Sequence, residues 1–301
     1  MDKEVIEEKT ENEPTNEKQP KPKKINKKRL FFRCLFILML IGLIAYMAIR
    51  LCDNSKYVVT FYEIEDEKID NHIRIVQLSD LHLKEYGENN SDLVNEIIRL
   101  KPDLIAMTGD MIDMHETDYS VVIELCRQLV NVAPVYFCYG NHEKEVIRVK
   151  QTSTVNVDLE NLGVHVLHNK YVTVNVNGNL LDIGGLSANP KALDAEYSQA
   201  FWQRYMNTTN YRLLLVHYPQ YFFKDGALLN SNVDMALCGH LHGGIVVIPF
   251  FGGLYHSVSG FFPEFTDGVR KINNTWVIVS RGIGGKIRVN NPPELVVIDI
   301  Y

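Results

Sequence analysis

The sequence predicts a layered α/β fold with two packed β-sheets and helices outside them, preceded by one N-terminal transmembrane helix. Three observations lead to this prediction: an apolar run at residues 30–51, apolar runs that alternate with helical stretches from residue 73 onward, and later segments that look more purely β. Strand and helix units in alternation, followed by strand-rich segments, are typical of layered α/β proteins.

Residues 1–29 differ in composition from the rest of the chain. They contain no aromatic residue and consist mainly of Lys, Glu, Asn, Gln and Pro, with an acidic first half and a basic second half. Such a stretch cannot bury enough apolar surface to fold alone. We therefore predict a disordered, charged tail over residues 1–29.

Residues 30–51 predict a transmembrane helix that acts as a signal anchor. The run is interrupted only by Arg33 and Arg50, each near an end, and its length fits a bilayer core of roughly 30 Å. A buried core helix is disfavoured by the polar stop at residues 53–56. A cleaved signal peptide is disfavoured by the long charged leader and by the lack of a small-x-small site before Cys52. The basic cluster before the run predicts a cytoplasmic N-terminus and an extracytoplasmic body at the cell membrane.

Residues 53–301 are predicted to form one domain, because no linker or internal repeat interrupts them. With residues 1–51 set aside, 20 basic and 30 acidic side chains remain. An acidic body is a poor non-specific binder of nucleic acid, so no nucleic-acid partner is expected. The 5 cysteines show neither a CxxC pair nor zinc-finger spacing.

Short apolar runs in this body predict strands, each ending at a polar cluster: residues 73–79, 103–109, 134–140, 211–218 and 233–239. Between them, helical spacing predicts helices over 91–100, with Ser91 as N-cap, and over 119–130. Later strands are predicted at 164–169, at 171–185 with an Asn-Gly turn, at 275–282 and at 294–300.

The polar clusters at these strand ends contain residue types that bind hard or borderline divalent metals. Asp80 and His82 are expected on one side of an extended segment, because side chains alternate along a strand. Mixed nitrogen and oxygen ligands without a thiolate suit Mn, Fe, Zn, Co or Ni. Two such ions about 3.5–4 Å apart would clamp the attacking and leaving oxygens of a phosphoryl displacement. The candidate ligands are Asp80, His82, Asp110, Asn141, His217, His240 and His242.

A single Asp-x-His or Gly-Asn-His is more often turn chemistry than a metal site. Chance alone would rarely produce the whole series in this order with each member at a strand end, so the series predicts a functional site. The remaining histidines lack such a context and are interpreted as surface or core residues: His72, His115, His165, His168 and His256.

The series D-x-H, G-D-x-x-D, G-N-H-E, a single His and G-H-x-H resembles the calcineurin-like metallophosphoesterases over roughly residues 72–285. The Gly-Gly after His242, the IVVIPFFGGLY segment and the SRGIG at 280–284 resemble the membrane-anchored or exported bacterial branch of that superfamily. The resemblance implies a four-layer αββα sandwich and two divalent metal ions, expected as Mn, Fe or Zn.

The resemblance also implies which ligands bind each ion. One ion would take Asp80, His82, Asp110 and His242, and the other would take Asp110, Asn141, His217 and His240. His142 would stabilise the phosphoryl group and protonate the leaving oxygen as a general acid. Asp113 would orient His142 and hold it protonated.

The sequence leaves two possible roles open for Arg281, a phosphate-binding cation and a structural ion-pair residue. Its guanidinium matches the geometry of a phosphate, and it would serve equally well as a structural ion-pair residue.

The predicted activity is hydrolysis of a phosphoester, with a phosphodiester favoured and the two ions supplying the hydroxide nucleophile. Two alternatives remain: a pyrophosphatase acting on a nucleotide-sugar or lipid-linked envelope precursor, and a metal-binding envelope scaffold without turnover. The anchor favours a lipid-linked substrate by location. Of three Phe-rich segments, 201–206 and 220–224 are predicted as core, and 249–265 as an apolar lip that meets lipid.

Overall fold

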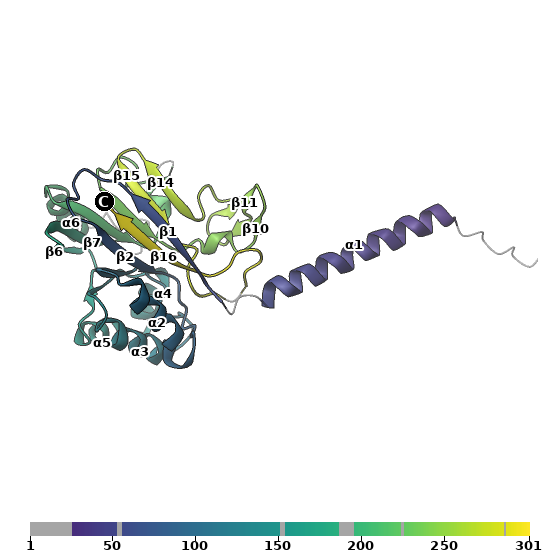
Figure 1. The fold of residues 1–301 in the computed structure, drawn as a ribbon, viewed down its shortest axis with the longest axis horizontal. Helices are drawn as coiled ribbons and strands as arrows, with labels where there is room; N and C mark the ends of the chain where they lie inside the picture. The colour runs from purple at the N-terminus through teal and green to yellow at the C-terminus, as the bar shows by residue number, and fades with distance from the viewer. Residues whose placement is uncertain (1–25, 53–55, 151–153, 187–195, 224–225, 286) are drawn as a thin grey trace, which may run out of the picture. The chain divides into compact units, whose positions relative to one another are not determined.

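The computed structural model describes residues 26–52, 56–150, 154–186, 196–223, 226–285 and 287–301 (Figure 1). The chain divides into two compact units, Met1–Tyr46 and Met47–Tyr301. Helix α1 (Lys27–Cys52) begins with the last basic residues of the predicted tail, most of which lies outside the described residues. By length and composition, its segment Lys27–Tyr46 could cross a membrane, a test that signal sequences also pass.

The second unit contains two six-stranded sheets, and both are mixed. In the first sheet β16 pairs parallel with β1 and antiparallel with β2, and the pairs from β2 through β5 are parallel. Its strand order is β1 (Val58–Ile64), β16 (Glu294–Ile300), β2 (Ile73–Leu78), β3 (Leu104–Met107), β4 (Val135–Phe137) and β5 (His165–Val166).

The second sheet is parallel from β15 through β9 and β8 to β7, with an antiparallel strand at each edge. Its order is β14 (Gly268–Ile272), β15 (Thr275–Val279), β9 (Met235–Cys238), β8 (Tyr211–Val216), β7 (Asn179–Leu186) and β6 (Lys170–Val176). The predicted Asn-Gly turn joins β6 to β7: Asn177 has φ 53° and Gly178 has φ 92°, as a type I′ hairpin turn requires.

Helices cover the outer faces of the two sheets. Helices α2, α3, α4 and α5 gather on one side of the sheets, and α6 lies apart from them beside β6 and β7 (Figure 1). The bounds are α2 (Ser91–Leu100), α3 (Ser120–Leu129), α4 (Asn141–Lys150), α5 (Val155–Asn161) and α6 (Glu196–Met206), with 3-10 turns η2 (Glu88–Asn90), η3 (Pro219–Phe222) and η4 (His242–Gly244).

The layers follow from side-chain alternation along the strands. Ile75 of β2 faces the second sheet, where it joins a core with Leu213 of β8. The next residue, Val76, faces the opposite way and packs with Leu93 of α2. A third core lies between the second sheet and α6. The predicted four-layer arrangement of helices, two sheets and helices is therefore confirmed.

Most predicted strands and both predicted helices are present, with strand ends trimmed by a few residues. Ser91 was wrong as an N-cap, because it is the first helical residue and Asn90 precedes it in a left-handed conformation. Strand β1 was not predicted. Neither were two small hairpins after the last histidine motif, formed by β10 (Val247–Ile248) with β11 (Gly252–Gly253) and by β12 (Tyr255–His256) with β13 (Gly260–Phe261).

Candidate metal centre

The polar clusters lie just beyond the carboxyl ends of parallel strands in both sheets. Ligands in open α/β sheets bind at this edge, because loops from neighbouring strands meet there. The order is Asp80 after β2, Asp110 after β3, Asn141 after β4, His217 after β8 and His240 after β9.

The backbone of most candidate ligands is left-handed. The φ angles are 54° at Asp80, 48° at His82, 53° at Asp110, 75° at His240 and 48° at His242. The predicted extended Asp80–His82 segment is therefore wrong, although both side chains still enter one cluster. Such conformations cost about 1–3 kcal/mol each and persist where the surrounding structure holds them.

Two glycines allow the loops to approach each other. A Cβ on Gly140 would overlap the Asp110 carboxylate, and a Cβ on Gly239 would overlap the hydroxyl of Ser79. Any side chain at either position would push a candidate ligand or its neighbour out of place.

The first ligand cluster joins Asp80, His82 and His242. The Nε2 atoms of the two histidines lie 3.2 Å apart, and Nε2 of His242 lies 3.5 Å from Oδ1 of Asp80. Burial and the neighbouring His82 lower the pKa of His242 to about 4, so this imidazole is neutral at pH 7 and available as a ligand.

The second ligand cluster joins Asp110, His217 and His240, with Asn141 beside them. Nε2 of His217 lies 3.2 Å from Oδ2 of Asp110, 3.2 Å from Oδ1 of Asn141 and 3.2 Å from Nδ1 of His240. Burial lowers the pKa of His240 well below its ordinary value, which leaves that ring neutral as well.

The hydrogen bonding of His217 shows that the second cluster fits a cation. Its Nδ1 donates to the Thr108 carbonyl oxygen at 2.8 Å, so the lone pair of the neutral ring is on Nε2. That lone pair faces a carboxylate oxygen and an amide oxygen, two further acceptors. Either a metal ion or an extra proton must separate them. Burial opposes the proton, but the Asp110 carboxylate outweighs burial and raises the pKa of His217 to about 9.

His142 lies beside both clusters, with Nε2 3.8 Å from Oδ2 of Asp110. Its Nδ1 accepts a hydrogen bond from the backbone N–H of Met114 at 2.9 Å, and Oδ1 of Asp113 is 4.0 Å away. In this conformation the ring is neutral with its proton on Nε2. A second proton on Nδ1 would have to replace the Met114 contact, and Asp113 is the acceptor within reach of it.

Glu143, the fourth residue of the Gly-Asn-His-Glu motif, is fully buried and positions the Asp110 loop. Its carboxylate accepts the backbone N–H groups of Gly140 and Asp110 on Oε2 and those of Met111 and Ile112 on Oε1, at 2.7–3.2 Å. Burial and the Asp110 charge raise the pKa of Glu143 to about 7, and these four donors oppose that rise because they fill the acceptor positions of the ionised carboxylate.

A cavity of about 460 Å³ opens beside the first cluster, lined in part by His82, His142 and His242. Two cations that the sequence did not single out also line it, Lys84 and Arg288. Arg288 is buried and donates through Nε and Nη2 to backbone carbonyls of residues 281–284. Burial and the positive charge of Arg288 lower the pKa of Lys84 to about 8.

Arg281 forms a structural ion pair, which is one of the two roles that the sequence left open. Its Nη2 lies 2.8 Å from Oε1 of the buried Glu294, and its backbone N–H donates to the other oxygen of the same carboxylate. His256, interpreted from the sequence as a surface or core residue, is buried, with its ring centroid 4.6 Å from that of His240.

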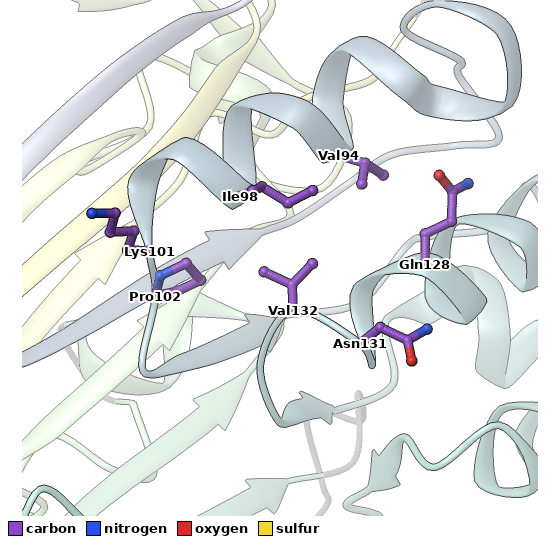
Figure 2. A pocket seen from close by; sticks show the side chains of 7 residues that line it. All are labelled: Val94, Ile98, Lys101, Pro102, Gln128, Asn131 and Val132. Carbon is purple, nitrogen blue, oxygen red and sulfur yellow. The ribbon is translucent and has the colours of Figure 1, made fainter.

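A larger cavity of about 660 Å³ lies between α2 and the end of α3, and none of the histidine motifs lines it (Figure 2). Among its lining residues, only Lys101 is ionisable, so it offers no set of metal donors. It is lined by Val94, Ile98, Lys101, Pro102, Gln128, Asn131 and Val132.

Comparison with known proteins agrees with this geometry. The profile of the calcineurin-like phosphoesterases matches residues 73–244, more than half of the chain and all of the ligand clusters. The chain belongs to the calcineurin-like phosphoesterase family. It is thus a metal-dependent hydrolase of phosphoric esters, and the predicted family and enzyme class are confirmed.

Two bacterial relatives show how far the similarity extends. The metallophosphoesterase YkuE of Bacillus subtilis is 31% identical over 222 residues, which covers 70% of this chain and 72% of the relative. The phosphodiesterase YaeI of Escherichia coli is 27% identical over 240 residues, which covers 75% of this chain and 82% of the relative.

Proposed function

We propose that this chain is a membrane-anchored phosphodiesterase that uses two divalent metal ions. The observation that supports it most strongly is the second ligand cluster, in which the Nε2 lone pair of His217 faces oxygens of Asp110 and Asn141. The similarity to a phosphodiesterase supports the choice of a diester.

In this proposal Asp80, His82 and His242 hold one ion, while Asn141, His217 and His240 hold the other. Asp110 is shared in this proposal, because its carboxylate contacts His217 of the second cluster and also interacts electrostatically with His82 of the first. When bound, such ions polarise the phosphoryl oxygens and provide a nucleophile at neutral pH by lowering the pKa of water. Manganese, iron and zinc all suit this mixed donor set.

His142 acts on the leaving group. With its proton on Nε2, the neutral ring donates a hydrogen bond to a phosphoryl oxygen. To give a proton to the leaving oxygen, the ring must first be charged, with Nδ1–H directed to Asp113. Asp113 therefore positions and charges His142, while Arg281 stays in its ion pair with Glu294 outside the cavity lining.

The membrane arrangement belongs to the same proposal. The charged tail of residues 1–29 lies in the cytoplasm, the apolar run of 30–51 crosses the membrane and residues 53–301 form the extracytoplasmic catalytic domain. The apolar character of α1 and the basic residues before it support this orientation.

The decisive experiment measures hydrolysis of bis-p-nitrophenyl phosphate and p-nitrophenyl phosphate by the full chain in detergent. The protein is stripped with a chelator and then reloaded with Mn, beside Asp110→Asn and the exposed matched control Asp118→Asn. We expect Mn-dependent turnover with the diester preferred, lost in Asp110→Asn and retained in Asp118→Asn.

Two bound ions without turnover of either ester would contradict the diesterase. That result would favour one of the two alternatives, a pyrophosphatase acting on a nucleotide-sugar or lipid-linked precursor or a metal-binding scaffold. A chain that binds no metal would overturn all three readings.

A further inference from the structure

The most exposed apolar side chains of the second unit gather in two neighbouring parts of the chain. Among its described residues, every large hydrophobic side chain that is at least 54% exposed belongs to this set. We call it the apolar patch: Phe250 (105%), Phe251 (76%), Val258 (72%), Phe261 (72%), Phe262 (54%) and Ile287 (63%). Exposed apolar side chains in such number are typical of a surface that binds protein or membrane.

The patch is carried on hairpins whose bases are fixed. Phe250 and Phe251 lie in the β10–β11 turn, and Val258 lies in the β12–β13 turn. At the base, the N–H of Leu254 donates to the Val246 carbonyl, and the N–H of Phe262 donates to the Leu254 carbonyl. Backbone hydrogen bonds therefore hold the bases of the hairpins that carry the exposed aromatic side chains.

The segment that carries most of the patch has no Asp, Glu, Lys or Arg from residue 243 to residue 263. A polar rim normally surrounds the apolar centre of a protein–protein interface. An uncharged aromatic surface fits the interfacial region of a bilayer better, because Phe side chains there bury against acyl chains without desolvating charges.

The patch adjoins the opening of the catalytic cavity. Ile245, at the start of the hairpins, and Ile287 both line the 460 Å³ cavity together with His82, His142 and His242. A surface that contacts the patch would therefore also lie beside the metal clusters.

The patch also lies near the point where the chain enters the second unit. The segment Val289–Pro293 accepts a hydrogen bond from the N–H of Val247 at one end and from the N–H of Val58 at the other. Only a few residues therefore separate the hairpin bases from the first residue of β1. Helix α1 ends at Cys52 and β1 begins at Val58, so the chain between these two residues spans at most about 22 Å.

From these observations we propose that the apolar patch docks on the outer surface of the bilayer that holds the N-terminal helix, with its aromatic side chains inserted among the lipids. Docking turns the mouth of the catalytic cavity toward the membrane. The substrate class follows, on the basis of the function proposed above: a phosphoester whose leaving group or ester arm is a membrane lipid.

Depth-dependent fluorescence quenching tests the docking without any turnover. The full chain carrying Phe251→Trp, or Val258→Trp in the other hairpin, is reconstituted into phosphatidylcholine vesicles whose acyl chains are brominated near the glycerol backbone. Leu180→Trp is the matched control, because Leu180 is 51% exposed and lies at the amino end of β7, opposite the metal centre. The spectrum of the unaltered chain corrects for Trp202 and Trp276.

We expect bromine to quench the fluorescence of Trp at 251 and 258 at least two-fold more than at 180. Equal quenching at all three positions would overturn the proposal, because the body would then have no preferred face. Weak quenching at 251 and 258, with a blue shift in detergent that grows with protein concentration, would also overturn it and assign the patch to a second copy of the chain. Quenching in a protein that hydrolyses no ester would keep the docking and remove only the proposed activity.

Discussion

His217 controls how the metal-free site holds protons. Its Nδ1 is committed to the Thr108 carbonyl, and Nε2 faces the Asp110 carboxylate at 3.2 Å. Without a cation, a proton on Nε2 lets His217 donate a hydrogen bond to the Asp110 carboxylate. The metal and a proton therefore compete for one atom.

Metal loading should release close to one proton at pH 7. Burial lowers the pKa of His217, but Asp110 outweighs it and brings the value to about 9, above the ordinary 6.5. The competing proton is fully bound below about 6.5 and is lost as the pH rises through about 9, so metal affinity should increase over that window. Calorimetric titration of Mn in buffers of different ionisation enthalpy measures the proton count. Affinity that is independent of pH from 6.5 to 9 would contradict this assignment.

Asp113 should control the alkaline side of the pH–rate profile. Burial lowers the pKa of His142, and Asp113 is one of the carboxylates that raise it. A general acid works in its protonated form, so activity falls as pH rises through the pKa of His142. Removing the Asp113 charge lowers that pKa. Asp113→Asn should therefore move the alkaline limb of kcat to lower pH and slow esters with poor leaving groups most.

The same profile should stay in place for Asp118→Asn, whose carboxylate is on the surface. If Asp113→Asn lowers kcat equally at all pH values and for all leaving groups, its role is structural support of the loop and not charging of His142.

The residue types of the site could be predicted from the sequence, but their conformations could not. Each ligand follows a strand-forming run, which the sequence shows directly. The left-handed backbone at Asp80 and His82 depends on contacts with the Asp110 loop. The backbone N–H of Asp80 donates to the Gly109 carbonyl, and that of His82 donates to the Asp110 carbonyl. Arg288 reaches the site from 46 residues beyond His242, so only the tertiary fold brings them together.

At the scale of elements, α4 joins the two loops that carry ligands from the first sheet. It begins at Asn141 directly after β4, and its third residue Glu143 binds the N–H groups of the neighbouring loop after β3. A single side chain in the first turn of a helix thus fixes the backbone on which Asp110 lies. From the sequence, Glu143 could be recognised as part of the Gly-Asn-His-Glu motif, but its positioning role could not be predicted. Its partners lie in two loops that only the fold brings together.

Glu143→Gln should destabilise the protein by at least about 2 kcal/mol, because an amide NH₂ replaces one acceptor oxygen and leaves buried N–H donors unsatisfied. The free energy of unfolding in urea, measured on metal-free protein, checks this value. Glu124→Gln is the control, because its side chain is 42% exposed and its carboxylate pairs with Arg127 and Gln128, both on the surface of α3. That change should stay within about 0.5 kcal/mol. Equal effects of the two variants would contradict the positioning role of Glu143.

At the scale of the whole molecule, the three Phe-rich segments separate by environment, as the sequence predicted. Phe201 of α6 and Phe222 of η3 are buried in the outer core of the second sheet, 2% and 1% exposed. Phe261, in the segment interrupted by Gly and Pro, is 72% exposed. The two-residue strands that carry it were not predicted, because hairpins so short leave no alternating pattern to read.

Replacing Phe261 and Phe262 together with Ser should separate two kinds of substrate. Both side chains are exposed and neither lines the catalytic cavity, so chemistry on a small soluble ester such as bis-p-nitrophenyl phosphate should be unchanged. Hydrolysis of a phosphodiester held in vesicles should fall several-fold, because docking brings that substrate to the cavity mouth. The full chain is assayed in the same vesicles with both substrates, beside Leu180→Ser as the matched exposed change. An equal loss on both esters would show that the two phenylalanines support the fold of the hairpins, and membrane contact would then play no part in turnover.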